Sequence, residues 1–187
     1  MVTKVIIFLI IFTSSALASC KEYSNFSNDE IQHIQIQINK KEKFVKHVTK
    51  YYLSKKIQKP LTNFNKKKKF NARIIVNYDS GNYCTYKAKL RMHGDGTDHI
   101  SLIDGIPISS LNVELKEGNI KNIKKFILFK PNSRNYENEI FAATLLKHIG
   151  FLSPRTFKVK VKVFNAENEY IFQEDLKKEF LENNNRV

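Results

Sequence analysis

Cysteine is nearly absent from this chain. Cys20 and Cys84 are the only two cysteines among 187 residues, and they do not form a Cys-x-x-Cys pair. A disulfide framework and a paired-cysteine zinc site are therefore excluded. Two glycine motifs are missing as well. The chain has no Gly-x-x-x-x-Gly-Lys-Ser/Thr loop of P-loop nucleotide-binding proteins and no Gly-x-Ser-x-Gly elbow of serine hydrolases.

Arginine is also scarce, although the chain is strongly basic. The formal net charge is +14, yet only five of the 32 basic residues are arginines. Arginine is the side chain that pairs bidentately with phosphate and guanine, so its scarcity argues against nucleic acid as a partner. An AT-rich genome also produces a composition rich in Lys, Asn and Ile. An anionic membrane surface, which gains about 1 kcal/mol per nearby basic residue, is the more natural partner.

A long apolar run is missing, and the most apolar segment lies at the N-terminus. Lys4 precedes an apolar stretch, residues 5–12, which is too short for a membrane-spanning helix of about 20 residues. This pattern is typical of a secretory signal, here residues 1–19, and predicts export. The sequence Leu17-Ala-Ser-Cys20 looks like a bacterial lipobox, so we expect a lipid on Cys20 to anchor the protein in the envelope. Ordinary signal cleavage is the alternative, and it would leave a plain thiol.

The residues after the signal predict a tether and then a helix. Residues 20–27 are polar. Ser-Asn-Asp-Glu at residues 27–30 fits a capping box, and apolar residues recur at roughly helical spacing through a helical lead, residues 28–60. Pro60 would end the helix. The segment 34–38 alternates between Ile and Gln and therefore also fits a strand.

From residue 70 onward, short alternating segments and turn residues predict hairpins. Cys84 lies in such a segment and is expected to be a buried thiol. We expect an α+β fold in which an N-terminal helix is followed by antiparallel hairpins around a central helix. The predicted strands cover residues 72–78, 83–92, 111–115, 125–129, 156–164 and 170–173, and the helices cover residues 136–149 and 175–182.

Two groups of lysines stand out along the chain. Asn-Lys-Lys-Lys-Lys at residues 65–69 fits a solvated linker, or alternatively a contact to phosphate or lipid. Lys158, Lys160 and Lys162 alternate with valines in the predicted strand 156–164. This alternation indicates a sheet with one solvated lysine face.

Several short motifs follow one another in a fixed order between residues 91 and 186. They are Arg-Met-His-Gly-Asp at 91–95, Asp-His at 98–99, Ser-Leu-Asn-Val-Glu-Leu-Lys at 110–116, Phe-Ile-Leu-Phe at 126–129, Pro-Asn-Ser-Arg at 131–134, a helix-like run carrying Glu139, and Glu-Asn-Asn-Asn-Arg at 182–186. This order resembles the CotH kinase family, named for a spore-coat protein with an atypical kinase fold, and most of all an envelope branch of it. The resemblance covers about half of the chain and implies a partial CotH kinase-like domain at residues 70–187.

The resemblance implies an ATP-dependent phosphotransferase that uses Mg²⁺ and acts on an envelope protein. The family's catalytic acids lie further along than Val187, so no catalytic residue is assigned. Each candidate also fits a plain surface or turn role, and a non-catalytic envelope lipoprotein with a lysine-rich surface is the alternative function. The nucleotide-binding candidates implied by the resemblance are Arg91, Lys116, Arg134, Glu139 and Glu174.

His93, Asp95, Asp98 and His99 lie within seven residues and include two glycine neighbours. Imidazoles and carboxylates of this kind bind transition metals, but a short turn does not easily bring four side chains together. We therefore expect no metal. Asp95, Asp98 and His99 are instead predicted to order the loop through hydrogen bonds to its backbone.

Overall fold

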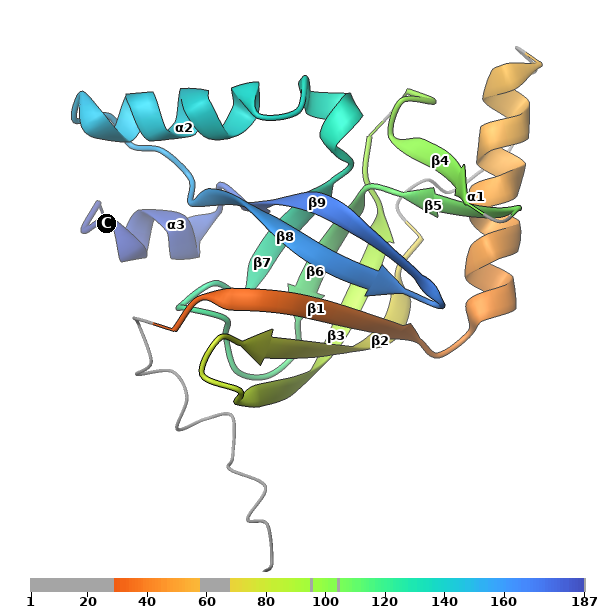
Figure 1. Cartoon of the computed structure of the whole chain (residues 1–187), viewed down its shortest axis with the longest axis horizontal. Helices are drawn as coiled ribbons and strands as arrows, with labels where there is room; N and C mark the ends of the chain where they lie inside the picture. Colours follow the sequence, from red (N-terminus) through yellow and green to blue (C-terminus); the bar gives the residue numbers. More distant parts are fainter. Residues whose placement is uncertain (1–28, 58–67, 95, 104, 187) are drawn as a thin grey trace, which may run out of the picture.

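The computed structural model describes residues 29–57, 68–94, 96–103 and 105–186. Strands dominate this part of the chain, and its helices lie outside the main sheet (Figure 1). The elements are β1 (Ile31–Ile38), α1 (Lys41–Lys56), β2 (Phe70–Tyr78), β3 (Tyr83–Met92), β4 (Ile100–Ile103), β5 (Ile106–Ser109), β6 (Leu111–Leu115), β7 (Lys125–Phe129), the 3₁₀-helix η2 (Pro131–Arg134), α2 (Asn138–His148), β8 (Thr156–Val163), β9 (Ala166–Glu174) and α3 (Lys178–Asn183).

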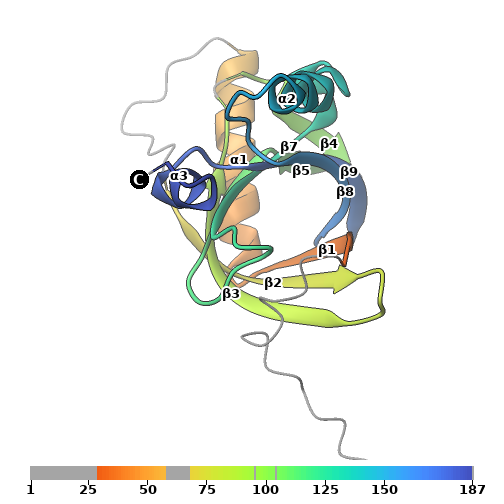
Figure 2. The same cartoon turned by 90° about the vertical axis from the view of Figure 1, so that its left-hand side faces the viewer.

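The main sheet is a closed barrel with the strand order β1-β2-β3-β6-β7-β9-β8, which Figure 2 shows end-on. Neighbouring strands pair antiparallel except at the closure, where β1 runs parallel to β8 and His33 lies opposite Lys160. β4 and β5 form a separate two-stranded hairpin. Closure removes the free sheet edges that strands otherwise expose.

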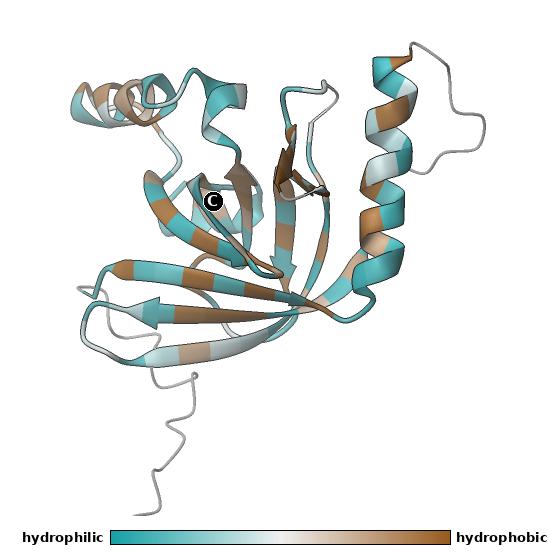
Figure 3. Ribbon diagram, turned by 45° about the vertical axis from the view of Figure 1, so that its right-hand side comes forward, coloured by the Kyte–Doolittle hydropathy of each residue, from teal (hydrophilic) through white to brown (hydrophobic). Residues whose placement is uncertain are grey.

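Alternating side chains explain why these segments form a barrel. Along β3 every second residue is buried, and the bands of hydropathy along the strands show the same pattern (Figure 3). The inward residues fill one apolar core. At its centre the ring of Phe172 stacks between Phe126 and Phe157, with centroids 4.5 and 4.7 Å away. Offset stacking of this kind adds to the free energy gained by burying the rings.

α1 packs against the core through one face. Phe44, Val48 and Tyr51, at spacings of four and three residues, are almost fully buried. The ring of Phe44 meets Phe70 edge-on at 5.2 Å, which joins the helix to the start of β2. α1 and α3 lie beyond opposite ends of the barrel (Figure 1).

The predicted fold, an N-terminal helix followed by hairpins around a central helix, is wrong. Residues 31–38 form β1, as the Ile-Gln alternation also allowed, and the helix begins only at Lys41. Glu30 does not cap a helix: its N–H donates to Asp79 Oδ1 at 3.1 Å, beside the β2–β3 turn. The reason is tertiary, because β1 gains a partner on each side, β2 and β8, when the barrel closes.

The predicted central helix, α2, lies outside the barrel rather than at its centre (Figure 2). Of its residues only Ala143 is buried, while Phe141 and Leu145 are 68% and 46% exposed. Gly150, which follows the end of this helix, has the positive φ of 85° that favours glycine there. The β4–β5 hairpin was not predicted, because its short strands carry no distinctive alternation.

The expectations for Cys84 and the lysine face can be compared with the structure, whereas those for the N-terminal residues cannot. Cys84 is fully buried and Lys158 and Lys160 are exposed, so the buried thiol and the solvated lysine face are confirmed. Several predictions lie outside the described residues: the signal at residues 1–19, the whole tether at 20–27 with Cys20, residues 28 and 58–60 at the two ends of the helical lead, residues 65–67 of the lysine run, and Asp95. Within the described ranges, no helix has the length and apolar character needed to cross a membrane.

Candidate functional site

One row of side chains crosses the outer face of the barrel. Arg91 of β3 faces outward, because its neighbours Leu90 and Met92 are buried in the core. The strand pairing places Arg91 beside Asn112, Asn112 beside Ile127, and Ile127 beside Gln173. Neighbouring strands lie about 5 Å apart, so Arg91 lies three strand spacings along this row from Gln173.

Arg134 lies on the same face, at the end of η2. Its guanidinium carbon sits 4.1 Å from the centre of the Phe129 ring, a cation–π arrangement. The His93 ring meets the same phenylalanine edge-on at 4.9 Å, and His99 lies 5.8 Å from His93. We refer to Arg91, His93, His99, Phe129 and Arg134 as the Arg91–Arg134 cluster.

The loop after β3 holds the two histidines in place. His99 Nδ1 lies 3.2 Å from Ser110 Oγ, and the N–H of Ser110 donates to the His99 carbonyl at 2.8 Å. Gly94 has φ of 89°, and a Cβ there would lie 2.0 Å from the His99 ring. Only glycine therefore allows this packing. Asp98 lies 3.8 Å from His99 Nε2. The loop-ordering role of Asp98 and His99 stays a prediction.

The cluster carries positive charge around a neutral histidine. The pKa of His93 is lowered to about 4, first by burial and then by His99, Arg91 and Arg134, against an opposing effect of Asp175. At neutral pH His93 is therefore uncharged. Arg134 and His93 contact the same Phe129 ring, and Arg91 is two residues before His93, so both arginines lie near the imidazole.

Neither guanidinium is satisfied by the described residues. Arg134 Nε is buried without a hydrogen-bond partner there. Arg91 Nη1 makes one long contact, 3.5 Å, to the carbonyl of Met92. A guanidinium offers five N–H donors in a planar fork, so both side chains retain donors for an anion.

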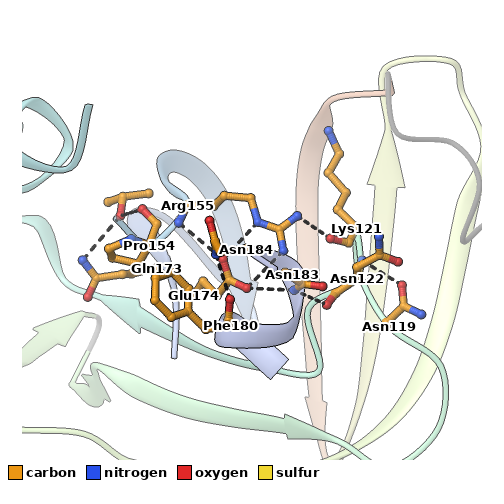
Figure 4. A network of polar contacts seen from close by, with 11 residues as sticks. Asn119, Lys121, Asn122, Pro154, Arg155, Gln173, Glu174, Phe180, Asn183 and Asn184 are labelled. Atoms are coloured by element: carbon orange, nitrogen blue, oxygen red, sulfur yellow. Dashed lines mark hydrogen bonds and ion pairs between the residues drawn. The ribbon is translucent and has the colours of Figure 1, made fainter. Parts of the chain in front are cut away.

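Glu174 belongs to a different structure, a polar network at the end of β9 (Figure 4). Its carboxylate is 4% exposed and accepts from Arg155 Nε at 3.0 Å and Nη2 at 3.1 Å. Asn183 of α3 donates to it at 3.1 Å, and Arg155 Nη1 also donates to the carbonyl of Lys121. The network joins β8, β9, α3 and the β6–β7 connection, so Glu174 is a structural residue here.

The two remaining candidates, Glu139 and Lys116, are also engaged elsewhere. Glu139 of α2 accepts from Gln173 Nε2 at 2.6 Å. Lys116 Nζ lies 3.5 Å from Glu114 Oε1. Asn112, which pairs with Arg91, is four residues earlier in the chain than Lys116. The structure therefore brings together Arg91 and Arg134 but does not bring Lys116 or Glu174 to them.

The residues described here do not fit a Mg²⁺ site. Within the described ranges, no three His, Cys, Asp or Glu side chains gather closely enough to hold a metal ion. Glu139 lies against the outward Gln173, whereas Glu174 is the next residue on β9 and points the other way. We therefore derive no catalytic step through magnesium.

The sequence did not single out three residues that lie in or next to the Arg91–Arg134 cluster and the Glu174 network. Phe129 looked like any apolar strand residue, although it supports both Arg134 and His93. Arg155, which holds Glu174, follows a Ser-Pro pair and had no marked pattern. Lys130 is 7% exposed, and burial lowers its pKa. A lysine directly after the apolar run Phe126–Phe129 was the available signal.

A strained turn presents Arg134. Asn135 and Tyr136 follow it with φ of 48° and 56°, a left-handed conformation that costs a non-glycine residue about 1–2 kcal/mol. We expect Tyr136→Gly to raise the free energy of unfolding by about 0.5–1 kcal/mol, measured by urea denaturation, since Tyr136 is 64% exposed. Tyr136→Ala keeps the strain and should not stabilise. Equal gains from both variants would contradict the role of strain.

No family model matches the sequence, and no curated protein shows significant similarity to it.

Proposed function

We propose that the Arg91–Arg134 cluster binds the phosphate groups of a nucleotide. In this proposal the chain is an exported bacterial protein similar to CotH kinases, anchored in the envelope through a lipid on Cys20. The observation that carries it is the position of two incompletely satisfied guanidinium groups near the half-buried, neutral His93.

The physical support lies in the type of charge and in its setting. Guanidinium groups bind phosphate oxygens through two parallel N–H···O bonds, which are about twice as strong as neutral hydrogen bonds. Phe129 fixes the plane of the Arg134 guanidinium, so little side-chain entropy is lost on binding. His93, neutral before binding, would bind a proton more readily beside the anion, because a nearby negative charge favours the imidazolium.

The same geometry limits the proposal to binding. Glu174 is held by Arg155 and Asn183, and Glu139 accepts from Gln173 on the other face of β9, so the two carboxylates do not meet at one metal position. This favours a second candidate function, a non-catalytic nucleotide-binding envelope protein. A phosphotransferase acting on an envelope protein would need acids outside those described here.

Calorimetric titration of the full chain with ATP, with and without Mg²⁺, tests the binding proposal. We expect saturable binding that does not depend on the metal. Arg91→Gln and Arg134→Gln should each weaken it at least tenfold, which is about 1.4 kcal/mol. Arg134→Lys should also weaken it, because lysine keeps the charge but not the planar fork.

The matched control is Arg73→Gln. Arg73 is an exposed arginine on β2 and lies opposite Lys87, four residues along β3 from Arg91. It should change the affinity less than twofold, although it removes the same charge. Equal losses at Arg73 and Arg91 would mean that ATP responds only to net charge and would contradict the proposal. Binding that requires Mg²⁺ would contradict the metal-independent binding expected here.

A further inference from the structure

A second basic feature lies where β1 passes into α1 and β2 begins. A cleft of about 360 Å³ opens there. Its size is at the lower end of small-molecule sites, which span about 300–1,000 Å³. In Figure 3 this end of α1 carries hydrophilic residues. The lining residues are Asn39, Lys40, Lys43, Lys68, Lys69, Phe70 and Asn71.

The charge of the cleft is poorly neutralised. Lys69 is the one lining lysine with an acidic partner among the described residues, Glu114 at 2.7 Å, and Glu114 also lies near Lys116. No described carboxylate lies within ion-pair distance of the other three lining lysines. Like charges around one small cleft repel one another, and the repulsion is weakened by salt but not abolished. A bound anion would remove it.

The walls of the cleft are ordered by the barrel. Phe70 is buried and packs against Phe44 of α1, and Lys68 Nζ lies 5.5 Å above its ring. The N–H of Asn39 donates to the carbonyl of Asn71 at 3.1 Å, which holds the two sides of the cleft together. The side-chain amides of both asparagines are available as donors from exposed positions. The lysines are thus carried by fixed backbone, not by a free loop.

We infer that this cleft binds a phosphate-bearing ligand. Lysine ammonium groups bind phosphate as point charges, and amide donors add directed hydrogen bonds. The aromatic ring of Phe70 offers an apolar wall to the organic part of the ligand. The phosphate belongs either to a small soluble molecule or to the headgroup of an anionic lipid. This site is separate from the Arg91–Arg134 cluster and does not depend on the proposed function.

Titration of the full chain with inorganic pyrophosphate tests the cleft, with amide chemical shifts as the readout. We expect the amides of Lys43 and Asn71 to shift saturably. In the K40Q/K43Q/K68Q variant the affinity read from Asn71 should fall at least tenfold. The local readout separates this site from the Arg91–Arg134 cluster, whose failure to bind ATP would leave these shifts unchanged.

The control variant K124Q/K147Q/K160Q removes three exposed lysines outside the cleft. It should lower the affinity by less than threefold. Flotation with phosphatidylglycerol vesicles, and with phosphatidylcholine vesicles for comparison, identifies the source of the phosphate. Cleft-dependent shifts with pyrophosphate indicate a soluble ligand, and cleft-dependent flotation on anionic vesicles alone indicates a lipid. Equal behaviour of the two triple variants toward both probes would overturn the inference.

Discussion

Arg155→Met should lower the free energy of unfolding by about 3–5 kcal/mol, because it leaves a buried carboxylate without its partner. Glu174 is 4% exposed and receives two hydrogen bonds from Arg155. Desolvation makes an unpaired charge at this position costly. Urea denaturation at pH 7, compared with the parent chain, measures the loss.

Two further variants separate this ion pair from general effects of charge. Arg73→Met removes an exposed arginine from β2 and should change stability by less than about 0.5 kcal/mol. The double variant R155M/E174L should recover much of the loss, because a well-packed apolar pair replaces a buried ion pair at little cost. If Arg155→Met and Arg73→Met lower the free energy of unfolding by the same amount, Glu174 is not held by Arg155 in solution.

His93 should make the protein sensitive to mild acid. Its pKa is about 4 in the folded chain and about 6.5 in the unfolded chain, so between these values the unfolded state binds the proton. The contribution of neutral His93 to the free energy of unfolding is therefore fully present above pH 6.5. It decreases as the pH falls and is lost near pH 4. Allowing for partial exposure of the ring, the loss is about 2–3 kcal/mol.

His93→Asn tests this contribution because asparagine does not titrate in this range. The free energy of unfolding of the variant is compared with that of the parent chain at pH 8 and at pH 4. Between these pH values the difference should shift by about 2–3 kcal/mol in favour of the variant. His47, whose pKa is also lowered by burial, still titrates in both proteins and cancels in the comparison. His148→Asn, at an exposed position in the last turn of α2, should follow the parent curve. Parallel pH curves for His93→Asn and the parent would contradict the buried, neutral imidazole.

Most individual strands followed from local pattern. The segments at β2, β3 and β8 alternate between buried and exposed residues, as their sequences indicated. β1 was assigned to a helix because its isoleucines also fit helical spacing in the longer window, residues 28–57. The pairing that decides between the two readings lies far away in sequence: Ile34 lies opposite Val76 on one side and Val161 on the other.

The candidate site was predicted in part. Arg91 and Arg134 were named from the order of motifs, and the structure places both within electrostatic range of His93. Glu174 was named for nucleotide binding, yet it pairs with Arg155, whose role no local pattern shows. Period-two alternation places Glu174 on the other face of β9 from Gln173, but the sequence could not show which face α2 would cover.

The sequence by itself determined the chain's basic charge, the near absence of cysteine and the positions of most strands. Composition and local alternation depend only on neighbouring residues, so they can be read directly. Tertiary structure alone decided that the sheet closes through β1 and β8, that α2 stays outside it, and that Glu174 is held by Arg155. These outcomes depend on contacts between residues far apart in the chain, whose free energy is gained only when the whole barrel forms.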